Sequence, residues 1–356
     1  MARTKSPGSK TQSYTLPKIN PDLMPTGSTL LNLACSGHPL GGWGKRRMVN
    51  VIGDSSSGKT ILVLTSFAET AKRKAFNNHR LIYDDSEEAN GFDVPRMFGD
   101  DLDERMESPQ EDDEGHPKYS DSIQDFLLNV DEAIKEPCIY VEDSFDALTT
   151  DEDGQVVEAL AKERRTGKKQ AGSYAMQKPK VASMMFRKIC HSLASSDSIL
   201  IVLSQTRDKI GAGMFESKKT RAGGKALKFY SSHEMWVSIK ETLKKSGFPI
   251  GILCQVKVSK NKLTGKVRVV DFPIYYDYGV DDITSMIDFL LDQKWWKISG
   301  KNITTAHFDG FSGSKQEITQ KAEEDDTFHK LLIWNTWQAW EAREEGLRLN
   351  RKRRFI

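Results

Sequence analysis

Short apolar runs alternate with longer amphipathic segments through the first two thirds of the chain. The apolar runs read MVNVIG, RLIYDD, CIYVED and SILIVLS. Between them, apolar residues recur at helical spacing over residues 60–75, 122–134 and 181–194. Buried parallel strands joined by crossover helices produce this alternation. The pattern therefore predicts an α/β fold with a mostly parallel central sheet.

The pattern changes after Ser232 and again near Val280. Three strand-like runs, EMWVSIK, GILCQVKVS and KVRVVDFPIYY, are separated by short polar turns, which predicts an antiparallel extension of the sheet. Amphipathic helices follow in DDITSMIDFLLDQ and TFHKLLIWNTWQAWEAREEGLRL. We expect a flexible N-terminal arm at 1–25, a core domain at 26–279 and a small α-rich C-terminal domain at 280–356. The acidic segment 99–118 is expected to be an exposed loop.

Charge is nearly balanced, with 52 lysines and arginines, 50 acidic residues and a formal net charge of +2. Attraction to nucleic acid would therefore come from local basic clusters, which occur at 162–180, at 207–228 and in the terminal RLNRKRRFI. The dispersed cysteines form no C-x-x-C pair, which argues against a disulfide framework or a zinc site. No apolar stretch approaches the roughly 20 residues of a membrane span, so we expect a soluble intracellular protein.

The stretch GDSSSGKT lies between a strand-like and a helix-like run and fits the pattern G-x-x-x-x-G-K-[ST]. In such a loop, backbone N–H groups hold nucleotide phosphates, Lys59 reaches the β and γ phosphates, and the Thr60 hydroxyl binds Mg²⁺. A merely flexible turn is the alternative. We predict a phosphate-binding loop made of Gly53, Asp54, Ser55, Ser56, Ser57, Gly58, Lys59 and Thr60.

Acidic residues end two of the predicted strands. Asp143 closes CIYVED, where it would hold the hydration shell of Mg²⁺, and Glu142 points to the opposite strand face. Glu87 and Glu88 follow RLIYDD, at the sheet edge where ligands collect in open α/β folds. A glutamate there can orient or deprotonate the water that attacks the γ-phosphate. These acids favour hydrolysis over phosphoryl transfer, and surface acids at a strand end or a helix start are the alternative.

Together with PTGSTLLNLA, LIVLSQTRDKIG, TRAGGKALKFYSS and VKVSKNKLTGKV, these stretches resemble the RecA family of DNA recombinases in order and spacing. The resemblance runs from about Thr26 to Tyr278, and GGKALKFYSS is its most specific part. It implies a RecA-like P-loop ATPase core that uses ATP and Mg²⁺. By matching position it implies these roles: Lys59 and Thr60 as phosphate and magnesium contacts, Glu87 as the water-activating residue, Asp143 as the metal-side acid, Gln205 as the γ-phosphate sensor, and Lys260 and Lys262 as lysines that reach the ATP of a neighbouring subunit.

The same resemblance implies two DNA-binding loops, at 165–177 and 206–224. The second loop is rich in glycine, lysine and arginine, which suits sequence-independent contact with backbone phosphates. Met214 and Phe215 would either wedge between bases or pack on their own core. A solvated basic loop is the alternative for this segment, as a solvated basic hairpin is for Lys260 and Lys262. The implied DNA contacts are Arg165, Lys168, Lys169, Arg207, Lys209, Gly211, Met214, Phe215, Lys218, Lys219, Arg221, Gly223 and Gly224.

The function implied by the resemblance is ATP-dependent strand exchange. The protein would form head-to-tail helical filaments on single-stranded DNA, pair them with homologous duplex DNA and hydrolyse ATP to turn over. Single-strand-binding or loader proteins would be further partners, in the bacterial cytoplasm or nucleoid. Two alternatives remain: a ring-shaped hexameric DNA motor of the same fold, and a mediator that binds ATP without hydrolysing it.

The two ends of the chain depart from the family. Its bacterial members usually end in an acidic tail, whereas this tail is basic. Such divergence would fit a phage-encoded or otherwise atypical member. Several assignments are therefore weakly determined. They are the adenine contacts (Phe92, Asp93 or Pro95), the subunit anchor (Tyr14 or Leu16), and the role of Trp295 and Trp296 in duplex capture or in a core.

Overall fold

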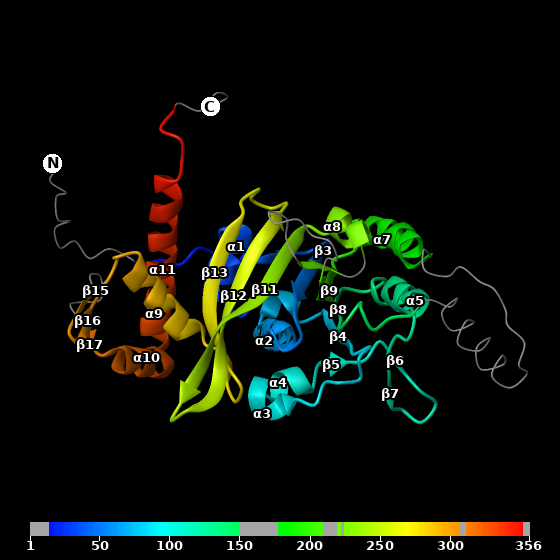
Figure 1. The fold of residues 1–356 in the computed structure, drawn as a ribbon, viewed down its shortest axis with the longest axis horizontal. Coiled ribbons are helices and arrows are strands. Elements are labelled where there is room, and N and C mark those ends of the chain that lie inside the picture. Colours follow the sequence, from blue (N-terminus) through cyan, green and yellow to red (C-terminus); the bar gives the residue numbers. More distant parts are fainter. Residues whose placement is uncertain (1–13, 150–176, 209–218, 222–223, 306–310, 352–356) are drawn as a thin grey trace, which may run out of the picture. The chain divides into compact units, whose positions relative to one another are not determined.

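The computed structural model describes residues 14–149, 177–208, 219–221, 224–305 and 311–351 (Figure 1). A ten-stranded sheet has the order β14-β13-β12-β11-β3-β9-β8-β4-β5, with β10 paired to β9. The strands from β11 to β5 pair in parallel, and β12, β13 and β14 continue the sheet in antiparallel fashion. The predicted α/β fold with an antiparallel extension is thus confirmed. Its strands are β3 (Arg47–Gly53), β4 (Arg80–Asp84), β5 (Met106–Glu107), β8 (Cys138–Glu142), β9 (Ile199–Asp208), β10 (Lys219–Arg221), β11 (His233–Lys245), β12 (Phe248–Asn261), β13 (Arg268–Tyr275) and β14 (Gly279–Val280).

Helices cover both faces of this sheet. On one face lie α5 (Ile123–Ala133), α7 (Gln177–Ser195) and α8 (Gly224–Tyr230), which Figure 1 shows side by side. Their apolar residues form one buried cluster with alternate strand residues such as Tyr140, Leu200 and Val202. The opposite face carries α2 (Lys59–Ala71) and α1 (Thr29–Ser36). The Ser66 hydroxyl of α2 donates at 2.9 Å to the carbonyl of Thr26, three residues before α1. Helices therefore support the sheet from both sides.

Polar side chains fix the starts of the helices. Ser122 and Asp125 form a reciprocal capping box at the start of α5. At the start of α1, the Thr29 backbone N–H and hydroxyl both donate to the Asp282 carboxylate, at 2.7 Å each. Asp282 opens α9 (Asp282–Asp292), and burial raises its pKa to about 7. This carboxyl thus joins two helix starts that are far apart in the sequence.

A long hairpin leaves the sheet at its antiparallel side. β11 has 13 residues and β12 has 14, whereas the neighbouring β3 has only 7. β11 pairs with β3 only as far as Val237, and β12 pairs with β13 only from Gly251 onward. Among the described strands, the hairpin beyond these points pairs only with itself. Its tip exposes Phe248, at 74%.

The acidic segment 99–118 is more ordered than the loop predicted from its composition. It contains α4 (Asp100–Asp103), the hairpin of β6 (Gln110–Glu111) and β7 (Pro117–Lys118), and β5, which pairs with β4 as an edge strand of the central sheet. The interpretation as a loop was wrong at these positions. Leu102 is fully buried, and two backbone N–H groups in the β6–β7 turn donate to the Asp112 carboxylate, which lowers its pKa. Acidic residues here stabilise a turn and do not prevent folding.

The chain forms two compact units. The larger spans Ile19–Ser285, and the smaller combines Met1–Lys18 with Met286–Ile356. The larger unit thus starts before residue 26, because β1 (Leu23–Met24) pairs with β2 (Trp43–Gly44) and buries Met24 completely. Its other elements are η1 (Lys74–Phe76) and α3 (Val94–Phe98). None of the described helices has the length and apolar character to span a membrane.

The smaller unit is a helical body with a small sheet. It contains most of α9, a three-stranded sheet, and the helices α10 (Lys315–Glu324) and α11 (Asp326–Gly346). The sheet consists of β15 (Lys297–Ser299), β16 (Asn302–Thr304) and β17 (Ser312–Gly313). Trp296 is only 2% exposed and belongs to the core, and Trp295 is partly exposed. The Tyr14 ring contacts Trp334 on α11 edge to face, 5.0 Å between ring centres. The start of the described chain therefore packs on its own C-terminal unit.

Candidate functional site

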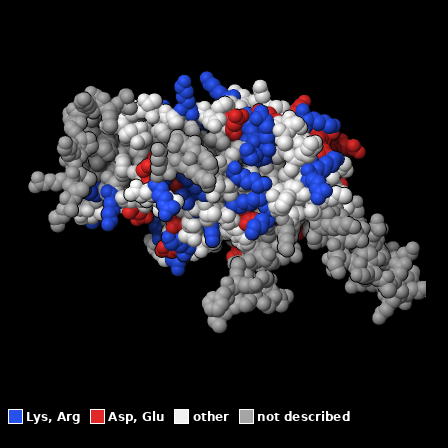
Figure 2. Space-filling model, turned by 90° about the horizontal axis from the view of Figure 1, so that it is seen from above, with Lys and Arg blue, Asp and Glu red and all other residues white. Residues whose placement is uncertain are grey.

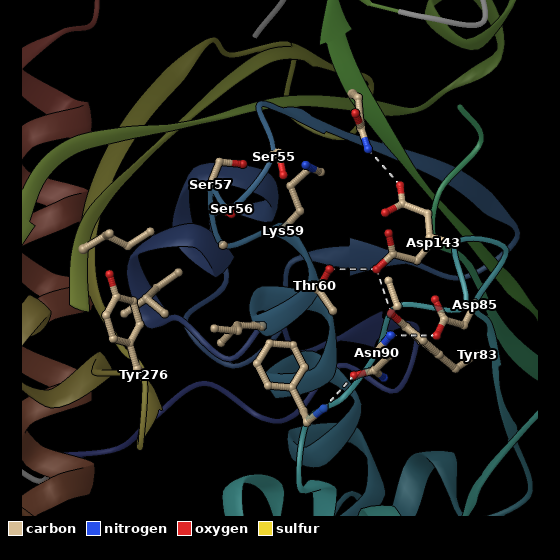
Figure 3. Close-up of a pocket in the computed structure, with 18 residues that line it drawn as sticks. Ser55, Ser56, Ser57, Lys59, Thr60, Tyr83, Asp85, Asn90, Asp143 and Tyr276 are labelled. Atoms are coloured by element: carbon tan, nitrogen blue, oxygen red, sulfur yellow. Dashed lines mark hydrogen bonds between the residues drawn. The ribbon is translucent and has the colours of Figure 1, made fainter. Parts of the chain in front are cut away.

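The loop Gly53–Thr60 joins the end of β3 to the start of α2 (Figure 3). Its backbone turns sharply, with positive φ at Ser56 (59°) and at Gly58 (92°). A β-carbon on Gly53 would lie 2.5 Å from the Ser57 hydroxyl and 2.7 Å from the Val237 carbonyl, so only glycine fits there. This curled backbone at a helix N-terminus is the geometry that binds phosphate.

Lys59 is buried beneath the loop, with 7% of its surface exposed. Its ammonium group donates to the carbonyls of Gly53 at 3.1 Å and Asp54 at 2.8 Å. Burial lowers the pKa of Lys59, and the carboxylates of Asp143 and Glu87 oppose that shift. A buried cation surrounded by carbonyls and acids gains a stronger partner when a phosphate enters.

The Thr60 hydroxyl donates to the Asp143 carboxylate at 2.8 Å, and the Tyr83 hydroxyl donates to the same oxygen at 2.7 Å. Burial raises the pKa of Asp143, and these two hydrogen bonds oppose the shift. Hydroxyl and carboxylate oxygens suit Mg²⁺, which prefers hard oxygen ligands and usually binds through one or two carboxylates plus nucleotide phosphates. No cluster of three or more metal-binding side chains occurs in the described part of the chain. The residues therefore fit a magnesium ion that arrives with its nucleotide.

Glu87 and Gln205 meet at this edge although 118 positions separate them in the sequence. The Gln205 side-chain amide donates to the Glu87 carboxylate at 2.8 Å, and the Ser144 hydroxyl donates to the same oxygen. Glu87 lines the cavity, whereas Glu88 is absent from its lining. The carboxylate is held by two donors and remains exposed, so water can reach it.

Glu142 lies on the other side of its strand from the phosphate loop and is fully buried. It neighbours Asp84 across the β4–β8 pair and accepts a hydrogen bond from the Ser86 hydroxyl at 2.7 Å. Burial and the Asp84 carboxyl raise the pKa of Glu142 well above its usual value. Of the two adjacent acids, only Asp143 lines the cavity.

The cavity has a volume of about 380 Å³ and extends from the phosphate loop to an apolar end. That end is lined by Ile252 of β12, by Ile274 of β13 and by Tyr276, which directly follows β13. Figure 3 shows Tyr276 across the cavity from Asp85 and Asn90. Of the three residues considered for adenine, Phe92 lines the cavity, and Asp93 and Pro95 do not. No sequence motif marks Ile252, Ile274 and Tyr276, because their position at the cavity depends on how strands that are distant in the sequence pair.

Lys260 and Lys262 do not line this cavity. The Lys260 ammonium donates to the backbone carbonyls of Phe229, at 3.0 Å, and Lys228, at the carboxyl end of α8. Lys262 is exposed, and the buried Asn261 between them bonds to the Cys35 carbonyl at 2.8 Å. The chain does not bring these lysines to the cavity beside its own phosphate loop.

Most implied DNA contacts lie outside the described residues. These are Arg165, Lys168, Lys169, Lys209, Gly211, Met214, Phe215, Lys218 and Gly223. The backbones of Arg207, Lys219 and Arg221 lie in the paired strands β9 and β10, and Gly224 begins α8. The Thr206 hydroxyl, beside Gln205, donates to the Asp54 carboxylate of the phosphate loop. Figure 2 shows Lys and Arg side chains gathered along the middle of the face seen from above.

Comparison with known proteins agrees with this geometry. The family model described as the RecA N-terminal domain matches residues 12–281. The RecA protein of Amycolatopsis mediterranei is 31% identical over 278 residues, covering 78% of this chain and 72% of that protein. The RecA protein of Leifsonia xyli is 30% identical over 279 residues, covering 78% of this chain and 70% of its own length. The matched region contains the phosphate loop, the sheet edge and the apolar end of the cavity, and the chain belongs to the RecA family.

Proposed function

We propose that this protein is a DNA-dependent ATPase that forms helical filaments on single-stranded DNA and exchanges strands with homologous duplex DNA. The observation that carries the proposal is the placement of Glu87. Its carboxylate shares one sheet edge with Lys59, Thr60 and Asp143, and it is held by Gln205 of strand β9. A hydrolytic site is thus bonded to the strand that leads toward the proposed second DNA loop.

Each residue has a proposed task in hydrolysis. The amides of the phosphate loop and the Lys59 ammonium bind the phosphates, while Thr60 and Asp143 hold a bound Mg²⁺, which would neutralise charge on the phosphates. Glu87 orients the attacking water and accepts its proton. The Gln205 amide, released from Glu87, would meet the γ-phosphate. Tyr276 and Ile274 would contact the nucleotide base at the apolar end.

Subunit assembly is supported by two features. Lys260 lies outside the nucleotide cavity of its own chain, so a contact with ATP would have to be made in a neighbouring subunit. Phe229, whose carbonyl accepts from Lys260, exposes 71% of its surface. A large exposed aromatic residue beside a proposed catalytic cation suits a surface that a second copy covers. We propose head-to-tail contact at this surface.

The test is ATP hydrolysis with and without single-stranded DNA, with negative-stain electron microscopy of the same samples. We expect DNA-stimulated turnover and long helical filaments, Lys59→Ala to lose nucleotide use, and Glu87→Gln to bind ATP without hydrolysing it. Rings that do not extend on DNA would indicate a motor, and nucleotide binding with negligible wild-type turnover would indicate a mediator. Normal hydrolysis by Glu87→Gln would contradict the role given to Glu87.

A further inference from the structure

Two fully buried carboxyl groups lie next to the nucleotide site without facing it. Asp84 and Glu142 are direct neighbours across strands β4 and β8, and each is 0% exposed. Asp84 accepts hydrogen bonds from the Ser120 backbone N–H at 2.8 Å, from the Ser120 hydroxyl at 2.6 Å and from the Tyr140 hydroxyl. Buried carboxyls are costly, so a pair of them calls for a physical explanation.

Glu142 is satisfied on one oxygen only. Its Oε1 accepts from the Ser86 hydroxyl, while Oε2 has no donor partner among the described residues. Asp84 occupies the position paired with Glu142 on the neighbouring strand β4. The Ser86 hydroxyl is therefore the donor that the buried Glu142 carboxyl holds.

Ser86 directly precedes Glu87 in the turn that follows β4. Within this turn, Asp85 accepts from the Asn90 backbone N–H at 2.9 Å, and Glu88 has a positive φ of 47°. The Ser86 hydroxyl connects the turn to the buried end of β8, whereas the contact from the Glu87 N–H to the Asp143 carbonyl is long, at 3.4 Å. Ser86, the residue beside Glu87, is thus bonded to a buried carboxyl in the core.

We propose that Glu142, acting through Ser86, is a positioning residue that holds the Glu87 turn against β8. This inference rests on the proposed role of Glu87 in hydrolysis. Neither Asp84 nor Glu142 lines the cavity. The Glu142–Ser86 hydrogen bond would fix the distance between the Glu87 carboxylate and the attacked phosphate. Reaction rates are very sensitive to such distances.

The test compares Ser86→Ala with Ser86→Thr in DNA-stimulated ATP hydrolysis. Ser86→Ala removes the hydroxyl, and we expect kcat to fall about 10- to 100-fold while KM for ATP stays within about twofold. Ser86→Thr keeps a hydroxyl and should retain most of the turnover. Glu142→Gln should also retain it, since an amide can accept from Ser86 and donate to Asp84. Glu142→Val can do neither and should match Ser86→Ala.

Tyr140→Phe is the matched control for a purely structural effect. It removes a hydroxyl from the Asp84 side of the same pair and leaves the Ser86 contact in place. We expect a lower melting temperature with an unchanged kcat. The alternative is that both Tyr140→Phe and Ser86→Ala lower kcat in proportion to their loss of melting temperature. That result would indicate general destabilisation and would overturn the inference.

The inference and the proposed function fail in different ways. Normal hydrolysis by Glu87→Gln would contradict the proposed function and remove the basis of the inference. If Glu87→Gln is inactive while Ser86→Ala and Glu142→Val turn over like the wild type, the function stands and the positioning role is refuted.

Discussion

The Thr60 hydroxyl offers a direct test of the magnesium site. It donates to Asp143 at 2.8 Å, and with a bound metal ion it would become a ligand. Thr60→Val keeps the shape of the side chain and removes the oxygen. A polar contact with a charged group contributes about 2 kcal/mol, so the dissociation constant for Mg·ATP should rise about 30-fold.

The change is measurable as ligand-induced stabilisation. At a free Mg·ATP concentration of about 100 times the wild-type Kd, ligand binding stabilises the wild type by about 2.7 kcal/mol. With a 30-fold weaker Kd, the same concentration stabilises Thr60→Val by only about 0.9 kcal/mol. Thermal unfolding with ATP and Mg²⁺, compared with ATP and a chelator, isolates the part of the shift that depends on the metal.

Thr65→Val is the matched control on the same helix. The Thr65 hydroxyl donates to the Ile61 carbonyl within α2 at 2.7 Å and does not line the cavity. We expect this variant to keep the full metal-dependent shift. An equal metal-dependent shift in Thr60→Val and the wild type would show that Thr60 does not bind the ion.

Three further predictions concern the apolar pocket, the α1–α9 contact and the subunit interface. Gly251→Ala would place a methyl group 2.4 Å from the Ile274 carbonyl, so we expect a loss of about 1–3 kcal/mol in denaturant unfolding together with weaker ATP binding. Burial raises the pKa of Asp282 from 3.8 to about 7, so its stabilising proton is present near pH 4 and lost as pH rises through 7. The unfolding free energy of the wild type minus that of Asp282→Asn should therefore fall by about 2–3 kcal/mol between pH 5 and pH 8. Lys260→Met and Lys59→Ala should each lack DNA-stimulated ATPase, and mixing them should restore part of it; no recovery would indicate that Lys260 acts within its own chain.

The sequence was most informative where a pattern repeats or a motif has fixed spacing. The apolar runs predicted the parallel strands because burial on both faces demands continuous apolar residues. The phosphate loop could be located because its backbone geometry demands particular glycines. β5 was missed since two residues, Met106 and Glu107, carry no periodicity.

Contacts between distant residues could not be predicted in this way. Tyr276 and Ile252 reach the cavity only because β12 and β13 pair beside the phosphate loop. Two examples are the Ser86–Glu142 and Thr206–Asp54 hydrogen bonds. No motif or periodicity in the sequence marks these residues as partners. Glu87 and Gln205 were assigned by family resemblance, and their meeting became visible only in the fold.

The long β11–β12 hairpin also affects how the protein can be handled in solution. Beyond Val237 and Gly251 its backbone edges pair with no other described strand, and such edges tend to pair with other chains. Lysines are common protectors of exposed edges, and Lys240, Lys244 and Lys245 occupy this one. Their charges would oppose edge-to-edge pairing at this hairpin, whose tip carries the exposed Phe248. Replacing Lys244 and Lys245 with valine would favour disordered aggregation.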